Sequence, residues 1–174
     1  MPEEEPVGRT VDRLRRVQLE LAVGPRPGRK SVDCLRAQQF SHVCTLLGPH
    51  ENASDIERLA NQLGCKWIWL PITGGRLEVL GQLNMPQLVC RLLDNLDPVS
   101  GNHIYIHCSA GIHRTGFAAY TILRLRGLTQ IQALNELETM RKVTAAQLGA
   151  ERVTLAETMV QAMIEDDKAN VPPT

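Results

Sequence analysis

Short apolar runs alternate with helix-like segments through the first two thirds of the chain. Four of these runs have the length and the glycine, proline or polar boundaries of strands, and they occupy residues 17–23, 42–47, 66–71 and 103–108. Most of the segments between them, and nearly all residues after Thr115, place apolar side chains three or four positions apart, which is typical of helices. This alternation predicts an α/β fold in which helices flank a central, mainly parallel sheet, with a helical C-terminal third.

Capping residues locate several helix ends. Ser54 and Glu57 have the spacing of a capping box, and Gly64 is suited to end the same helix. Thr129 and Gln132 repeat the capping-box spacing later in the chain. We therefore expect one helix that begins at Ser54 and another that begins at Thr129.

Length and composition indicate a single domain. The chain has 174 residues, of which 43% are hydrophobic, so it can bury one sizeable core. We expect this core to span about residues 15–163, with flexible ends at residues 1–14 and 165–174. Lysine and arginine total 19, as do aspartate and glutamate, and this zero net charge argues against nucleic acid as a partner.

The sequence contains no membrane signal. Its apolar runs are all shorter than the ~20 residues that cross a bilayer, and the N-terminal MPEEE is unlike a signal peptide. We therefore expect a soluble, cytoplasmic protein without membrane insertion, and its oligomeric state is open. The five cysteines are an odd set, most of which we expect to be reduced: Cys34, Cys44, Cys65, Cys90 and Cys108.

The candidate chemistry lies in residues 102–120, NHIYIHCSAGIHRTGFAAY. A strand that ends before Cys108 and a helix that begins near Arg114 place the loop between them at the carboxyl edge of a parallel sheet, where anions bind to helix N-termini. A thiol in that position has its pKa lowered from ~8.5 to between ~4 and ~7. The planar guanidinium of Arg114 can hold two oxygens of a tetrahedral anion. The loop therefore predicts a nucleophile beside a phosphate site.

The segment His107 to Gly116, HCSAGIHRTG, resembles the signature loop of the cysteine-dependent protein tyrosine phosphatase superfamily. That signature has histidine and cysteine, five further residues, arginine, and then serine or threonine. The chain length and the order of elements are similar to those of the compact dual-specificity branch. The resemblance covers residues 15–163, and outside the loop it depends on the order of elements.

This resemblance implies a role for each residue of the loop. Cys108 attacks phosphorus and forms a phosphocysteine, while Arg114 binds the phosphoryl oxygens. Thr115 donates a hydrogen bond to the Cys108 sulfur, and His107 orients the loop and helps to hold the thiolate. The substrate-binding N–H groups are those of Ser109, Ala110, Gly111, Ile112, His113 and Arg114. The family requires no metal and no organic cofactor.

The same residues also have interpretations that involve no catalysis. Cys108 alone would be an ordinary buried thiol, and Arg114 and Thr115 would simply begin a helix. His103, His107, Cys108 and His113 include types that bind zinc. One strand and its loop do not bring such ligands together tetrahedrally, and the neighbouring arginine opposes a cation.

The expected proton donor is missing. Relatives of this kind carry an aspartate about thirty residues before the cysteine, whereas residues 70–80, LPITGGRLEVL, contain none. The first carboxylate there is Glu78, which is either a general acid or, as we favour, a solvent-facing residue at a helix start. Asp55 and Asp94 are more distant alternatives.

His113 and two cysteines raise further questions. His113 occupies a position where many relatives have glycine, and it either adds positive charge below pH ~6.5, which favours substrates with several phosphates, or points to solvent. Cys34 and Cys44 are candidate partners for a disulfide that protects oxidised Cys108.

Two functions from different classes follow. The favoured one is a phosphatase that removes phosphate from phosphotyrosine, and also from phosphoserine and phosphothreonine, in a phosphorylated protein substrate. The alternative is a phosphate-binding module, weakly active or inactive, that recognises phosphorylated partners, and a phosphoinositide is open as a non-protein substrate. The intact Cys108, Arg114 and Thr115 favour the enzyme, whereas the missing aspartate favours the module.

Overall fold

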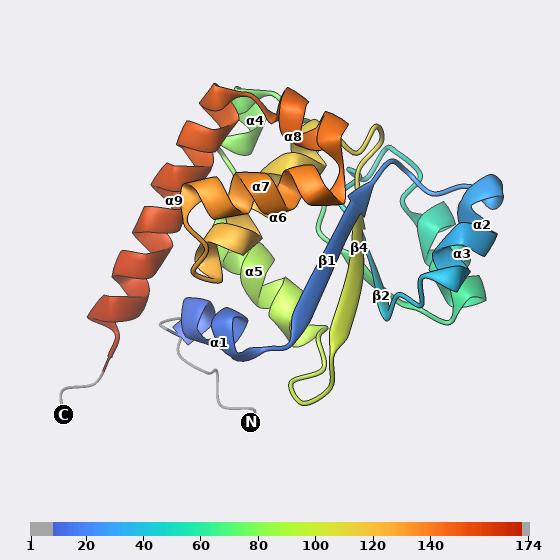
Figure 1. The fold of residues 1–174 in the computed structure, drawn as a ribbon, viewed down its shortest axis with the longest axis horizontal. Helices are drawn as coiled ribbons and strands as arrows, with labels where there is room; N and C mark the ends of the chain where they lie inside the picture. Colours follow the sequence, from blue (N-terminus) through green and yellow to red (C-terminus); the bar gives the residue numbers. More distant parts are fainter. Residues whose placement is uncertain (1–8, 172–174) are drawn as a thin grey trace.

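The computed structural model describes residues 9–171, and in this part of the chain four strands form one parallel sheet (Figure 1). The strands are β1 (Leu19–Gly24), β2 (His42–Thr45), β3 (Lys66–Trp69) and β4 (Asn102–His107). Their order is β1-β4-β2-β3, and every pair is parallel. The predicted α/β fold and all four predicted strands are confirmed, with the strand ends moved by up to two residues.

The register of the sheet places the carboxyl ends of β1, β4 and β2 side by side. His107 at the end of β4 lies opposite Gly24 of β1 and Thr45 of β2. The segments that follow these three strands therefore leave the sheet at one edge. This edge collects residues from distant parts of the chain around Cys108.

Helices cover the two faces of the sheet unequally (Figure 1). One face carries α1 (Thr10–Arg16), α4 (Leu77–Leu80), α5 (Met85–Asp94), α6 (His113–Leu125), α7 (Gln130–Met140), α8 (Lys142–Leu148) and α9 (Ala150–Ala169). The other carries α2 (Val32–Ala37), the preceding turn Arg29–Ser31, and α3 (Ser54–Leu63). Of the 13 residues of α6, 10 are buried, so α6 is the inner helix of the thicker layer.

The helix ends test the capping predictions. Thr129 and Gln132 form the predicted box, with Gln132 N–H donating to Thr129 Oγ1 at 3.2 Å and Thr129 N–H donating to Gln132 Oε1 at 2.9 Å. Gly64 ends α3 in the left-handed region, at φ 70°. The capping box at Ser54 is wrong, because Ser54 already lies inside α3, Ala53 is the N-cap, and no side chain caps this end.

The predicted flexible ends are too long. Residues 10–14 belong to α1, whose Val11 and Leu14 are buried in the core, and residues 165–169 belong to α9. The apolar pattern of α1 was too short to be recognised as a helix in the sequence. The rest of the predicted ends, residues 1–8 and 172–174, lies outside the described residues. Within residues 9–171, no helix is both long and apolar enough to cross a membrane.

Candidate active site

Cys108 lies where the inner strand turns toward the inner helix. β4 ends at His107, α6 begins at His113, and the Cys108 residue is only 3% exposed. The loop between them needs Gly111, which has φ +69°, and a Cβ at this position would lie 2.1 Å from the carbonyl oxygen of Gly24. The loop is therefore packed tightly against the end of β1.

The surroundings of Cys108 favour its thiolate. Burial alone would raise the pKa of this thiol, but hydrogen bonds from the Thr115 hydroxyl and from the backbone N–H groups of Thr115, Ile112 and Gly111 outweigh burial and lower the pKa below its ordinary value. Thr115 Oγ1 is buried, and within the described part of the chain no partner meets the usual distance and angle limits of a hydrogen bond to it. The Cys108 sulfur is therefore the acceptor available to this hydroxyl.

Arg114 is held in a fixed orientation by Glu51. Its Nη1 donates to Glu51 Oε2 at 2.6 Å and its Nη2 to Glu51 Oε1 at 3.0 Å, while Nη1 also donates to the carbonyl of Ile72 at 2.9 Å. The carboxylate in turn accepts the N–H of Gly48 at 2.7 Å. The hydrogen bonds to Arg114 lower the pKa of Glu51, and Glu51 raises the pKa of Arg114. This pair keeps a charged guanidinium aimed along the loop.

Glu51 was not predicted from the sequence. It stands 63 positions from Arg114, and no local spacing marks it. The available signal was its place after the apolar run 42–47, because that run ends at the carboxyl edge of the sheet.

His107, the last residue of β4, is fully buried and supports the loop that follows it. Its Nδ1 lies 3.0 Å from the carbonyl oxygen of Cys108, which can only accept, so Nδ1 carries the proton. Its Nε2 then accepts from the hydroxyl of Thr45 at 2.8 Å, and that oxygen accepts from Trp67 Nε1 at 2.9 Å. Burial lowers the pKa of His107 to about 4. Nδ1 of this neutral imidazole binds a backbone carbonyl and Nε2 binds the Thr45 side chain, so neither nitrogen is left for the sulfur.

The remaining predicted loop residues lie at the surface of the site. Ser109 and Ala110 are exposed, Ile112 is half-buried, and the backbone N–H of Arg26 donates to Ser109 O at 2.9 Å. His113 is exposed at the first position of α6. Burial and the nearby Arg152 lower its pKa, so it is neutral at pH 7 and adds positive charge only at acid pH.

The expected acid region, residues 70–80, contains one carboxylate, that of Glu78. Residues 70–76 connect β3 to α4, and Glu78 is exposed in the first turn of α4. Asp94 lies at the far end of α5, where it is 3.5 Å from Arg13. Asp55 pairs with Arg58 at 2.8 Å and lies 3.8 Å from Arg26, beside the rim of the site.

The cysteines differ in reactivity. All five are free thiols. Burial raises the pKa of Cys44 to about 12 and also raises the pKa of Cys65, so these two are inert, in contrast to Cys108. Cys34 is exposed and accepts a hydrogen bond from Gln38. A disulfide of Cys108 with Cys34 or Cys44 stays a prediction.

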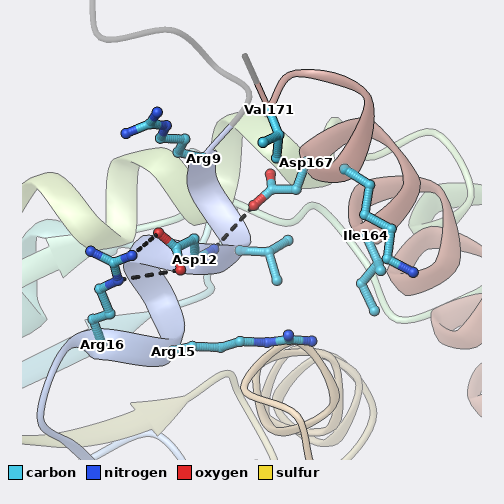
Figure 2. Close-up of a pocket in the computed structure, with 9 residues that line it drawn as sticks. Arg9, Asp12, Arg15, Arg16, Ile164, Asp167 and Val171 are labelled. Atoms are coloured by element: carbon cyan, nitrogen blue, oxygen red, sulfur yellow. Dashed lines mark hydrogen bonds and ion pairs between the residues drawn. The ribbon is translucent and has the colours of Figure 1, made fainter. Parts of the chain in front are cut away.

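A cavity of about 410 Å³ lies between α1 and α9, and Figure 2 shows its lining. Both carboxylates of its lining have partners there: the Asp12 carboxylate accepts from Arg16 at 2.9 Å, and the Asp167 carboxylate accepts from the Asp12 N–H at 3.0 Å (Figure 2). None of the residues that line this cavity belongs to the loop at 107–116. It is therefore separate from the candidate active site.

No protein-family model matches the sequence, and no curated protein matches it. Solved structures do match. A mutant form of Tk-PTP is 19% identical, with 85% of this chain and 93% of that chain covered and a TM-score of 0.56. The kinase associated phosphatase KAP, with its catalytic-site cysteine changed to serine, is 16% identical over 89% and 93%, with a TM-score of 0.55.

A third match is the core catalytic domain of the PP-IP phosphatase SIW14 from S. cerevisiae in complex with citrate, 16% identical over 86% and 88%, with a TM-score of 0.54. The chain has the fold of the cysteine-based tyrosine and dual-specificity phosphatases. The predicted resemblance is therefore confirmed for the fold. At these sequence identities, the matches show that the fold is shared, and they do not show that the activity is shared.

Proposed function

We propose that the protein is a phosphoric monoester hydrolase that uses Cys108 as a covalent nucleophile. The observation that carries this proposal is the meeting, in one loop, of a thiol with a lowered pKa and an arginine whose two outer nitrogens are aligned by Glu51. A phosphate group between them meets a nucleophile on one side and a cation on the other. KAP, which shares the fold, has a catalytic-site cysteine, and this agrees with the role given to Cys108.

Binding of the phosphate uses the backbone and Arg114 together. The loop begins α6, so its N–H groups and the positive end of the helix dipole can bind an anion. The guanidinium of Arg114 adds charge-assisted hydrogen bonds to the phosphoryl oxygens. These contacts strengthen as negative charge spreads over the oxygens in the transition state, which lowers the barrier and not only the dissociation constant.

The reaction proceeds in two displacements. The Cys108 thiolate forms a bond to phosphorus while the bond from phosphorus to the leaving oxygen breaks, and that oxygen takes up a proton. Water then attacks the phosphocysteine, the sulfur–phosphorus bond breaks, and inorganic phosphate and the thiolate are released. The Thr115 hydroxyl stabilises the departing sulfur, because it donates to the thiolate that re-forms.

We propose phosphotyrosine in proteins as the substrate, with phosphoserine and phosphothreonine as slower substrates. A phosphotyrosine side chain offers a leaving group whose pKa is ~10, against far higher values for the alcohols of serine and threonine. SIW14, which has the same fold, is described as a PP-IP phosphatase. A non-protein phosphate such as a phosphoinositide is therefore also a candidate substrate.

A second candidate function is a phosphate-binding module with little turnover. It is favoured by one observation, the absence of any carboxylate in the described loop 70–76. In such a module Cys108 and Arg114 bind a phosphorylated partner, and the missing proton donor keeps the ester intact.

Steady-state turnover of a substrate panel separates these functions. The panel contains nitrophenyl phosphate, a phosphotyrosine peptide, a phosphothreonine peptide and a phosphoinositide, and Cys108→Ser serves as the matched inactive variant. An enzyme of the proposed kind hydrolyses nitrophenyl phosphate and the phosphotyrosine peptide, and Cys108→Ser does not. A protein that binds the phosphotyrosine peptide but turns over no member of the panel is the module.

A further inference from the structure

Arg141 contacts the Cys108 loop from the side opposite the phosphate site. It stands at the junction between α7 and α8, as the C-cap of the first and the N-cap of the second. Its Nη1 donates to Gly111 O at 2.8 Å and to Ala110 O at 3.1 Å. The buried Thr144 hydroxyl donates to the same Gly111 oxygen at 2.7 Å. Two successive carbonyls of the loop are thus held by one short segment, 30 residues away in the chain.

The same two peptide groups serve the nucleophile. The carbonyls of Ala110 and Gly111 belong to the peptide units that carry the N–H groups of Gly111 and Ile112, and these N–H groups help to lower the pKa of the Cys108 thiol. In a trans peptide the C=O and N–H bonds point in opposite directions, and the described residues contain no cis peptide. A group that holds the carbonyls outward therefore keeps the N–H groups directed inward.

Glycines allow the close packing that this arrangement needs. A Cβ on Gly116 would lie 3.2 Å from Thr144 Cγ2 and 3.3 Å from Leu148 Cδ1, so the missing side chain lets α8 approach the first turn of α6. On the other side, Gly111 rests on the backbone of Gly24. The two peptide units are consequently fixed between β1 and α8.

We propose that Arg141 is a positioning residue for the nucleophile and that it acts through the peptide groups of Ala110–Gly111 and Gly111–Ile112. Thr144 supports it by donating to the same Gly111 oxygen. The hydrogen bonds of Arg141 go to the Ala110 and Gly111 carbonyls and to the Thr144 hydroxyl. Its charge polarises both peptide dipoles in the sense that favours negative charge on Cys108. The inference rests on the proposed function, since the thiolate that Arg141 supports is the proposed nucleophile.

The direct test is the thiol pKa of Cys108, measured on the full chain from the pH dependence of iodoacetamide labelling of the Cys108 peptide. Arg141→Met should raise this pKa by about one unit, which leaves roughly tenfold less thiolate at pH values below it. Thr144→Val removes one uncharged donor to the same carbonyl and should raise the pKa by a smaller amount.

Arg126→Met is the matched control. Arg126 also holds two backbone carbonyls, those of Leu14 at 2.6 Å and Val17 at 3.0 Å, but it stands just beyond the other end of α6. This variant should lower the melting temperature and leave the pKa of Cys108 unchanged. An equal shift in Arg126→Met would overturn the proposal, because the effect would then be a general loosening of the fold.

Each remaining outcome is also decisive. An unchanged pKa in folded Arg141→Met overturns the proposal, and if that variant does not fold, the presence or absence of a shift in Thr144→Val decides it. A Cys108 pKa in the unaltered protein no lower than that of free cysteine would instead remove the proposed function. A lowered pKa that neither variant changes would remove only the role of Arg141.

Discussion

Two loops meet at the candidate active site, and they are built differently. The loop from Cys108 to Arg114 carries the proposed nucleophile and phosphate-binding groups, and hydrogen bonds hold it from the segment after β1, from α8 and from Glu51. The loop 70–76 packs against it, since a Cβ on Gly75 would lie 2.8 Å from that of His113. It contributes backbone carbonyls, those of Ile72 to Arg114 and Gly75 to Arg152, and no carboxylate.

This difference separates phosphate binding and nucleophilic attack from proton delivery. The first loop is part of the packed core, so its geometry exists before a substrate arrives and costs little to reorganise. The second loop contains no carboxylate, so in the proposed reaction the leaving oxygen departs as an anion or takes its proton from solvent. A substrate with a good leaving group needs only the first loop.

Apart from the loss of the nucleophile in Cys108→Ser, the largest effect is expected at Arg114. Arg114→Lys keeps the charge but loses the planar pair of donors that Glu51 aligns, so kcat/KM for nitrophenyl phosphate should fall by roughly 10² to 10³. Steady-state kinetics at fixed ionic strength measures it. A loss below tenfold would show that Arg114 does not bind the reacting phosphate.

A smaller loss is expected at Glu51. Glu51→Gln keeps the size and one acceptor but removes the charge, so Arg114 is less well aligned and kcat/KM should fall about tenfold. The reverse ranking, with Glu51→Gln more harmful than Arg114→Lys, would indicate that Glu51 acts on the substrate itself. The same kinetic assay, with both variants side by side, decides between the two.

The second loop is tested by leaving-group dependence. Without a proton donor, turnover should fall steeply from nitrophenyl phosphate to phosphotyrosine to phosphothreonine, since general acids contribute roughly 10² to 10⁴ only where the leaving oxygen needs a proton. Glu78→Gln should change each rate less than twofold, because Glu78 is exposed. A hundredfold loss on phosphotyrosine with nitrophenyl phosphate spared would make Glu78 the acid after all.

His107, which supports the first loop, should make the stability of the protein depend on pH. The pKa of His107 is about 4 in the folded chain and ~6.5 when unfolded, so the unfolded chain binds more protons between these values. Its contribution to the free energy of unfolding is therefore present above pH 6.5 and falls by up to ~3 kcal/mol as the pH drops to 4.

Urea titrations at pH 6.5 and 4.5 measure this loss, and His107→Gln provides the comparison. The variant is less stable throughout but should lose less stability between the two pH values. The window stays above the range in which Glu51, whose pKa is lowered, takes up its proton. Equal losses in both proteins would mean that His107 titrates near its ordinary pKa in the folded chain.

The parts that the sequence predicted are those encoded by nearby residues. His107, Cys108, Arg114 and Thr115 lie within nine consecutive positions, and a strand before them and a helix after them fix their arrangement. The capping box at Thr129 was also predicted, because both of its residues are local.

The parts that the sequence did not predict depend on contacts across the fold. Glu51 meets Arg114 across 63 positions and Arg141 meets Gly111 across 30, and neither spacing forms a pattern that can be recognised in one sequence. Ser54 shows the opposite error. Its capping motif is local and complete, yet the helix begins one residue earlier than the motif requires.

The central claim is that Cys108 forms a covalent bond to phosphorus, and trapping that intermediate tests it most directly. The protein is mixed with nitrophenyl phosphate, quenched with acid within the first turnovers, digested and analysed by mass spectrometry. We predict a peptide containing Cys108 that carries one phosphoryl group, absent from Cys108→Ser and from protein quenched without substrate. Turnover of nitrophenyl phosphate that persists in Cys108→Ser, or a phosphoryl group found on another residue, would contradict the claim.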